Sequence, residues 1–238
     1  MRLIKHIVLL IYSKIMIKNR WLNISWSDTV ADVDKAYIAQ HYGSLNAFEK
    51  KYEPSGLNLQ QCLPDPYSGN KNSKVYCLNM NPGEPDPCFY QHKKYEELTQ
   101  NNLRHDVKDC FWAEGLKGLC GKQHAGIDWM DKKMAGLTKV LGRRPNVFFI
   151  EYFPYHSKKG FSFPKYLPSY EYSDELIREA IRQEKLIIIM RSKKLWIERL
   201  PQLGKYPHVI TLKSPAGGWL SPNNFVPSFT IKEIKKYF

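Results

Sequence analysis

Four short apolar runs, separated by longer segments, constrain the fold of this chain more than any other feature. The runs cover residues 74–80, 146–153, 186–190 and 208–212, and they do not show a regular alternation of apolar and polar side chains. Strands of this kind are buried on both faces, and helices that alternate with them are typical of a parallel sheet covered on both sides. We therefore expect a three-layer α/β/α fold with a central, mostly parallel sheet of about four strands.

The segments between these runs carry helix signals. Residues 27–28 and 173–175 are Ser, Asp and Glu, the types that begin helices, and Thr230 with Glu233 fits a capping box. Gly142 follows a run with helical spacing and is placed to end that helix. We expect helices over residues 28–42, 45–52, 92–117, 127–141 and 192–200, and two more that begin near 173 and 230.

The expected elements divide the chain near residue 70. The first part holds two expected helices, a loop rich in Pro, Gly and Asn, and no expected strand. We therefore interpret residues 1–70 as an N-terminal helical extension packed on the core. Residues 71–238 hold all four expected strands and are predicted to form the α/β/α domain.

The chain is strongly basic, which favours a polyanionic partner. It holds 36 Lys and Arg residues against 23 Asp and Glu, for a formal net charge of +13, and DNA is the predicted partner. The apolar run at residues 7–12 is too short to span a membrane, and no small-residue cleavage site follows it. We expect a cytoplasmic protein without a membrane segment, and a monomer. Residues 1–18 are either an amphipathic helix or an extension upstream of a start at Met16.

The five cysteines argue against a disulfide framework, because their number is odd and no Cys-x-x-Cys occurs. Cys88 and His92 are four residues apart, as are Cys120 and His124, and two such pairs on helices can hold zinc. Prolines around Cys88 disfavour a helix there, so we predict no metal and keep the zinc site as an alternative. The chain has no Gly-rich phosphate-binding motif, and we predict no cofactor.

Polar residues follow the expected strands, at the edge where a parallel sheet binds ligands. Asn81-Pro82-Gly83 follows the first run, Glu151-Tyr152 lies in the second, Arg191 follows the third and Lys213 follows the fourth. The carboxamide of Asn81 can orient a water or a substrate. The rigid Pro82 and the small Gly83 suit a tight turn beside a ligand.

The sequence Asn79-Met80-Asn81-Pro82-Gly83 resembles the first active-site motif of the uracil-DNA glycosylase superfamily. It is most similar to the Asn-Pro-Gly form of the mismatch-specific and the single-strand-selective monofunctional enzymes. Ser214-Pro215 and Ser221-Pro222-Asn223-Asn224 are similar to the second motif, a loop that inserts into DNA. The resemblance covers residues 75–225. It implies an enzyme that flips a damaged or deaminated base out of DNA and hydrolyses its N-glycosidic bond.

The resemblance also implies roles for single residues. Asn81 matches the residue that positions the attacking water, and Glu151 stands where relatives carry an Asn that reads the pyrimidine edge. Phe89 or Tyr90 offers a face for stacking, and Trp219 or Leu220 a wedge in DNA. The predicted base-binding residues are Met80, Pro82, Gly83, Phe89, Glu151 and Tyr155. The predicted DNA-binding residues are Lys213, Ser214, Pro215, Trp219, Ser221, Asn223 and Asn224.

His156 is predicted to be the second catalytic residue, as an acid or as a phosphate contact. It stands beside Ser157, but the chain has no Gly-x-Ser-x-Gly elbow, which disfavours a serine hydrolase.

Two departures from the family pattern leave other functions open. Aligning Ser214-Pro215 with the second motif puts Leu212 where the family has its catalytic His. An ionised Glu151 offers only acceptors, which favours an amino group over a carbonyl at the base edge. A catalytically inactive protein that binds nucleic acid or a nucleobase on the same fold is therefore the alternative. A small-molecule enzyme of another class is the third hypothesis.

Overall fold

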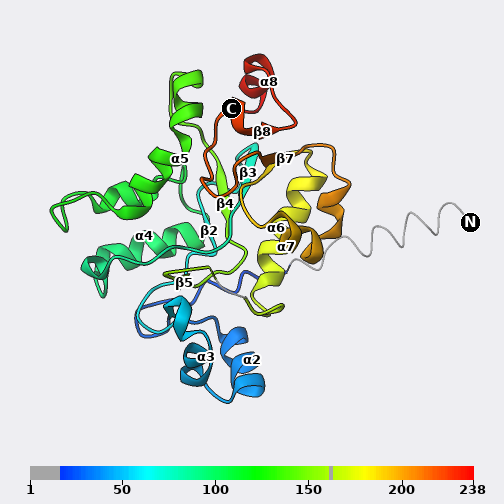
Figure 1. The fold of residues 1–238 in the computed structure, drawn as a ribbon. Coiled ribbons are helices and arrows are strands. Elements are labelled where there is room, and N and C mark those ends of the chain that lie inside the picture. The colour runs from blue at the N-terminus through cyan, green and yellow to red at the C-terminus, as the bar shows by residue number, and fades with distance from the viewer. Residues whose placement is uncertain (1–16, 161–162) are drawn as a thin grey trace, which may run out of the picture.

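A mixed sheet of six strands lies at the centre of the computed structural model, which describes residues 17–160 and 163–238 (Figure 1). The strands lie in the order β2-β4-β3-β6-β7-β8, and a separate two-stranded sheet pairs β1 with β5. The strands are β1 Leu57–Asn58, β2 Tyr67–Ser68, β3 Val75–Leu78, β4 Phe148–Ile150, β5 His156–Ser157, β6 Leu186–Ile189, β7 Val209–Leu212 and β8 Phe225–Val226.

The four expected strands form the middle of the sheet and pair in parallel, as predicted. Strand β3 lies between β4 and β6, with Tyr76 opposite Phe148 on one side and Ile187 on the other. Strand β7 continues the sheet beside β6. Every residue of β3, β4 and β6 is buried, which explains why their sequences are apolar without alternation.

The two edge strands run antiparallel and were not expected from the sequence. Strand β2 pairs with β4, and β8 pairs with β7. Each edge strand has two residues, too few for a periodic pattern. Strand β2 also precedes residue 70, where the extension was expected to end, so the chain enters the main sheet before that point.

Helices cover both faces of the sheet. In Figure 1, α4 and α5 lie on one side of the strands, and α6 and α7 on the other. The α-helices in the described residues are α2 Asp32–Tyr42, α3 Leu45–Lys51, α4 Lys93–Leu103, α5 Ala125–Leu141, α6 Tyr170–Arg182, α7 Lys193–Arg199 and α8 Ile231–Tyr237. Among the described residues, none of these helices is both long and apolar enough to cross a membrane.

Several helix ends differ from the prediction. Helix α2 begins at Asp32 and not near 28, because Ser25 and Asp28 bond to each other in an isolated bridge. Helix α6 begins at Tyr170, so Ser173 lies inside it and does not cap it. Helix α4 ends at Leu103, and only a short 3₁₀ turn follows within the range expected to be helical. The left-handed end of α5 at Gly142 and the capping box of α8 are confirmed.

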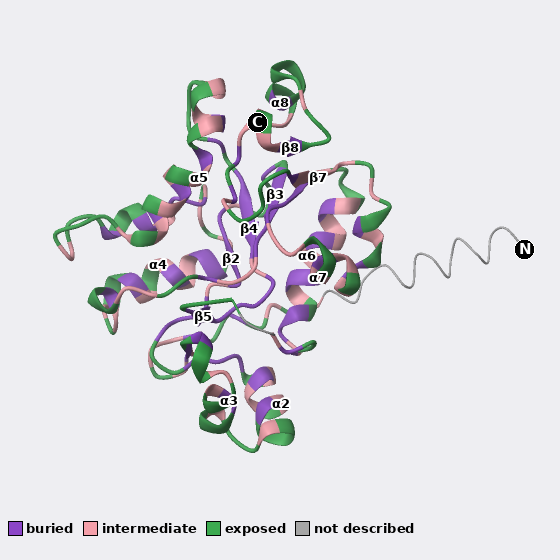
Figure 2. Ribbon diagram, in the orientation of Figure 1, coloured by how far each residue is buried: buried purple, intermediate pink, exposed green. Residues whose placement is uncertain are grey.

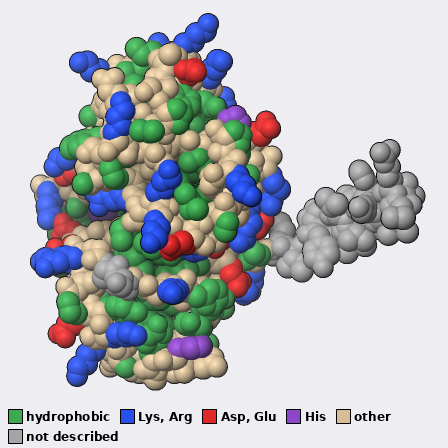
Figure 3. Space-filling view, turned by 45° about the vertical axis from the view of Figure 1, so that its right-hand side comes forward, with side chains coloured by type: hydrophobic (Ala, Val, Ile, Leu, Met, Phe, Trp, Pro, Cys, Tyr) green, Lys and Arg blue, Asp and Glu red, His purple; other side chains and the backbone are tan. Residues whose placement is uncertain are grey.

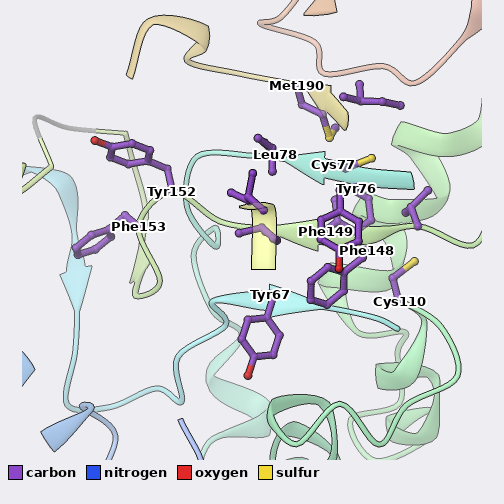
Figure 4. Packing of buried hydrophobic residues seen from close by; sticks show 14 of the residues in the cluster. Tyr67, Tyr76, Cys77, Leu78, Cys110, Phe148, Phe149, Tyr152, Phe153 and Met190 are labelled. Carbon is purple, nitrogen blue, oxygen red and sulfur yellow. The ribbon is translucent and has the colours of Figure 1, made fainter. Parts of the chain in front are cut away.

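One hydrophobic core joins both parts of the chain. Trp21, Ile38 and Phe48 belong to the same buried cluster as the strands. Figure 2 shows the buried residues along the central strands, and in Figure 4 Tyr67 lies close to the aromatic residues of β4. The ring centroids of Tyr67 and Phe148 are 5.6 Å apart.

Helix α2 is held to this core by a buried carboxyl group. Asp34 accepts hydrogen bonds from the backbone and hydroxyl of Ser169 and from the hydroxyl of Tyr155. Burial raises the pKa of Asp34 to about 6. Tyr155 is therefore part of the contact between the N-terminal segment and the core.

Candidate functional site

A cavity of about 350 Å³ opens at the carboxyl ends of the parallel strands. Its lining includes Asn79 and Asn81 after β3, Glu151 after β4 and Arg191 after β6. Strand β3 lies between β4 and β6, so the chain passes from β3 to β4 on one side and then crosses back to β6 on the other side of β3. Ligands of open α/β sheets bind at such a switch point.

The walls of the cavity are rich in aromatic rings. Phe89 lies 4.9 Å from the ring of His124, and Trp129 meets Phe149 edge to face at 5.6 Å between centroids. The aromatic lining residues are Phe89, Tyr90, Tyr95, Trp112, Trp129 and Phe149. Flat apolar walls of this kind suit a planar ligand, because rings offer large faces for stacking.

The polar floor is a hydrogen-bonded pair, Asn79 and Glu151. The Asn79 Nδ2 donates to Glu151 Oε1 at 3.0 Å. The other two polar atoms of the pair, Asn79 Oδ1 and Glu151 Oε2, are buried and have no hydrogen-bond partner among the described residues. Buried polar groups nearly always have partners, so this pair is arranged to meet a ligand or water in the cavity.

Burial keeps Glu151 protonated at neutral pH. Desolvation, with a smaller contribution from nearby Asp65, raises the pKa of the Glu151 carboxyl to about 8 against the lowering effects of Asn79 and Arg191. Since Oε1 accepts from Asn79, the carboxyl proton belongs on Oε2, which then donates. The neutral carboxyl thus presents a donor, where the sequence reasoning considered only the acceptors of the ionised form.

The side-chain nitrogen of Asn81 is held by acceptors of neighbouring residues. Its Nδ2 donates to the backbone oxygen of Pro82 at 2.7 Å and to the hydroxyl of Ser157 at 2.8 Å. With the nitrogen held by acceptors, the carboxamide oxygen is the atom left to accept a hydrogen bond from water or a ligand. Gly83 also lines the cavity, and no atom beyond its two chain neighbours lies within 4 Å of the place where its Cβ would stand.

His156 lines the cavity in its neutral form. Its Nδ1 lies 2.8 Å from the carbonyl oxygen of Gly83, so Nδ1 carries the proton and donates. Burial lowers the pKa of His156 to about 4. Its Nε2 is buried and makes no hydrogen bond that meets ordinary geometry among the described residues, although the backbone of Leu63 is close enough to raise the pKa of the ring. This lowered pKa disfavours the predicted role of His156 as an acid at neutral pH, and the role stays a prediction.

Two predicted base-binding residues do not line the cavity. Tyr155 is fully buried against Asp34. Met80 accepts a hydrogen bond from the Ser192 hydroxyl through its sulfur. Tyr152, predicted from its place after a strand, packs beneath the guanidinium of Arg199. The side chains of these residues make contacts within the protein and are not available to a ligand. A position at the end of a strand does not by itself indicate whether a side chain packs inside the protein or lines a cavity.

The loop over residues 213–224 lies beside the cavity but does not line it. Arg191, which does, donates to the carbonyl oxygen of Ala216 at 3.1 Å. Asn224 closes the loop through bonds to Ser214 and Trp219. Lys213, Ser214, Pro215, Trp219 and Asn223 are exposed, and Ser221 and Asn224 are half-buried. Leu220 is fully buried, so of the two predicted wedges only Trp219, 48% exposed, remains.

The sequence predicts no role for Asn79 or Asp65. Asn79 belongs to the Asn79–Gly83 motif and to the expected first strand, and an Asn that interrupts an apolar run is itself a signal of a polar contact. Asp65 lines the cavity, and burial raises the pKa of its carboxyl to about 7. Its segment precedes β2, which was read as a loop, so nothing local indicated that it lies beside Glu151.

One disulfide is present, although the cysteine count argues against a disulfide framework. Cys88 and Cys120 are joined by a disulfide. Their sulfurs are therefore not free to hold zinc, and within residues 17–160 and 163–238 no group of three or more metal-binding side chains occurs. The disulfide connects the segment that carries Phe89 to the segment that leads to His124, and both residues line the cavity.

Basic side chains are spread over the surface shown in Figure 3, with few acidic ones between them.

No family model, curated protein or solved structure matches the chain.

Proposed function

We propose that the protein is a uracil-DNA glycosylase-like hydrolase that removes a damaged or deaminated base from DNA. The observation that carries this proposal is the buried Asn79–Glu151 pair, which offers two unpartnered polar atoms at the floor of an aromatic cavity. Asn81 lines the same cavity with a free carboxamide oxygen. A flipped base needs faces for stacking, polar groups for its edge and a positioned water.

The polar pair matches one kind of base edge. Neutral Glu151 donates from Oε2 to a base carbonyl, and Asn79 Oδ1 accepts from the ring N–H beside it. Uracil, hypoxanthine and xanthine have such a carbonyl next to a ring N–H. Cytosine and adenine present an amino group next to a ring acceptor, which would set donor against donor and acceptor against acceptor. Each buried group left unpaired costs about 1–3 kcal/mol.

The proposed reaction is hydrolysis. A water that donates to Asn81 Oδ1 attacks the sugar carbon C1′, and the bond from C1′ to the base nitrogen breaks. The electron pair of that bond leaves with the base, whose negative charge spreads onto its carbonyl oxygens. The donor on Glu151 stabilises that charge. The water oxygen stays on the sugar, and its proton finally reaches the base nitrogen through solvent.

A strand-cleavage assay tests the proposed function. End-labelled oligonucleotides that carry one uracil, hypoxanthine, xanthine or mismatched base are incubated single-stranded and as duplexes with excess protein, then treated with alkali. We expect breaks at uracil, hypoxanthine or xanthine and none in an unmodified strand, which also supplies thymine and guanine as normal bases with the same edge. The absence of a break in every substrate would rule out the glycosylase.

A second function is favoured by the residue at the end of β7. Leu212, aligned with the family's catalytic His, is an apolar residue only 6% exposed, and the lowered pKa of His156 disfavours it as a replacement acid. A protein of this kind would bind nucleic acid or a nucleobase without turnover. It predicts DNA binding that weakens as salt rises, because contacts to phosphates release counterions. Retention of DNA that does not change with salt would count against it.

A further inference from the structure

The loop over residues 213–224 is bonded into the backbone of helix α5. The Leu220 N–H donates to the carbonyl oxygen of Lys133 at 2.8 Å, and the Leu137 N–H donates to the carbonyl oxygen of Leu220 at 3.2 Å. In a regular helix the groups of residues 133 and 137 bond to each other. Leu220 thus lies between two turns of α5, and the helix bends along its length (Figure 1). Insertion into the hydrogen-bond ladder is a known cause of such bends.

Two residues of α5 are fitted to this contact. At Gly136 a Cβ would lie 2.5 Å from the Cβ of Ser221 and 3.2 Å from the carbonyl oxygen of Leu220. Only glycine leaves room for the loop there, although glycine is a poor helix former. The ammonium group of Lys133 donates to the carbonyl oxygen of Gly217.

The other half of α5 forms a wall of the cavity. Ala125, Gly126, Trp129 and Met130 line it. The Lys133 ammonium lies 5.9 Å from the ring centroid of Trp129 in this wall and 4.5 Å from that of Trp219 on the loop. One side chain thus contacts both the exposed loop and the cavity wall.

From these contacts we infer that α5 couples the exposed loop to the cavity wall, with Lys133 and Gly136 as the positioning residues. The loop and the first half of α5 open and close as one unit. The outer surface of the loop suits a polyanion with aromatic bases, because Trp219 and Lys213 are exposed and the loop has no acidic residue. Only this choice of partner rests on the proposed function; the coupling itself does not.

Hydrogen exchange followed by mass spectrometry tests the coupling without any ligand. In Gly136→Ala we expect the amides of residues 213–224 and of residues 125–133 to exchange faster together, by about tenfold or more. An ordinary Gly→Ala change within a helix would slow exchange, so the expected sign is opposite. Ala135→Gly is the matched control at an exposed neighbouring position. It is expected to speed exchange within α5 and leave the loop unchanged.

Lys133→Met provides a second variant that adds no volume beside the loop. It removes the bond to Gly217 and the charge between the two Trp rings, and is expected to speed exchange in the same two segments. Faster exchange in the loop alone, or in neither segment, would overturn the coupling. Since no DNA is present, failure of the glycosylase assay leaves this result unaffected.

Discussion

We expect Asn81→Ala to lower the rate of base release about 100- to 1000-fold, the loss typical when one preorganised hydrogen-bonding group is removed from an active site. Asn81 Nδ2 is held by Pro82 and Ser157, so its oxygen is fixed before any water arrives. In the alanine variant the attacking water has no fixed acceptor. The measurement is the single-turnover rate of base release, with an unfolding curve to show that the variant folds.

Ser157→Ala is the matched control for Asn81. It removes one of the acceptors that hold Nδ2 and keeps the carboxamide oxygen. The net value of one such hydrogen bond is about 0.5–1.5 kcal/mol, so we expect about a tenfold loss at most. An Asn81→Ala rate close to that of the wild type would show that Asn81 does not position the water.

The second large effect concerns the proton on Glu151. Base release is expected to fall as the pH rises through about 8, where the Glu151 carboxyl ionises and loses its donor. Glu151→Gln keeps a donor at every pH and should remove this fall. Glu151→Leu removes both polar atoms and leaves Asn79 Nδ2 unpaired, so we expect a loss on the order of 100-fold or more. Equal pH profiles for the wild type and Glu151→Gln would contradict the role of the proton.

The same proton affects stability. The folded pKa of Glu151 is raised above its ordinary value of 4.5, so folding favours the protonated form. The stabilisation that this form provides is complete below about pH 4.5 and is lost as the pH rises through about 8. The free energy of unfolding should therefore fall over this range. Part of this fall, on the order of a few kcal/mol, should disappear in Glu151→Gln.

Much of the fold could be predicted because buried parallel strands have a strong sequence signal. The runs at β3, β4 and β6 are apolar and fully buried, since helices cover both faces of the sheet, whereas β7 includes Thr211 and is buried at alternate residues. Strands β2 and β8 were not predicted, because a strand of two residues is too short to show a periodic pattern of apolar side chains. Their positions depend on partners that are distant in the sequence.

Part of the site could also be predicted, because the carboxyl ends of parallel strands meet at one edge. Asn81, Phe89, Glu151 and His156 all line the cavity, together with Pro82 and Gly83. The importance of Asn79 depends on Glu151, 72 residues away, and on burial that changes the protonation of that carboxyl. No local pattern carries this information.

The loop and the cysteines were harder to predict for the same reason. Leu220 is buried because it inserts into α5, and the loop sequence alone does not indicate this burial. Cys88 and Cys120 are 32 residues apart, and the spacing of each to a nearby His suggested a metal site in place of a disulfide.

The most direct measurement is single-turnover base release from uracil, hypoxanthine and xanthine oligonucleotides at about pH 6 and about pH 10, on either side of the Glu151 transition. If the cavity is a glycosylase site with a protonated Glu151, the wild type releases at least one of these bases at the lower pH and much less at the higher. Glu151→Gln then releases that base at both. No release of any of them at either pH, by wild type at saturating protein, would contradict the proposed function.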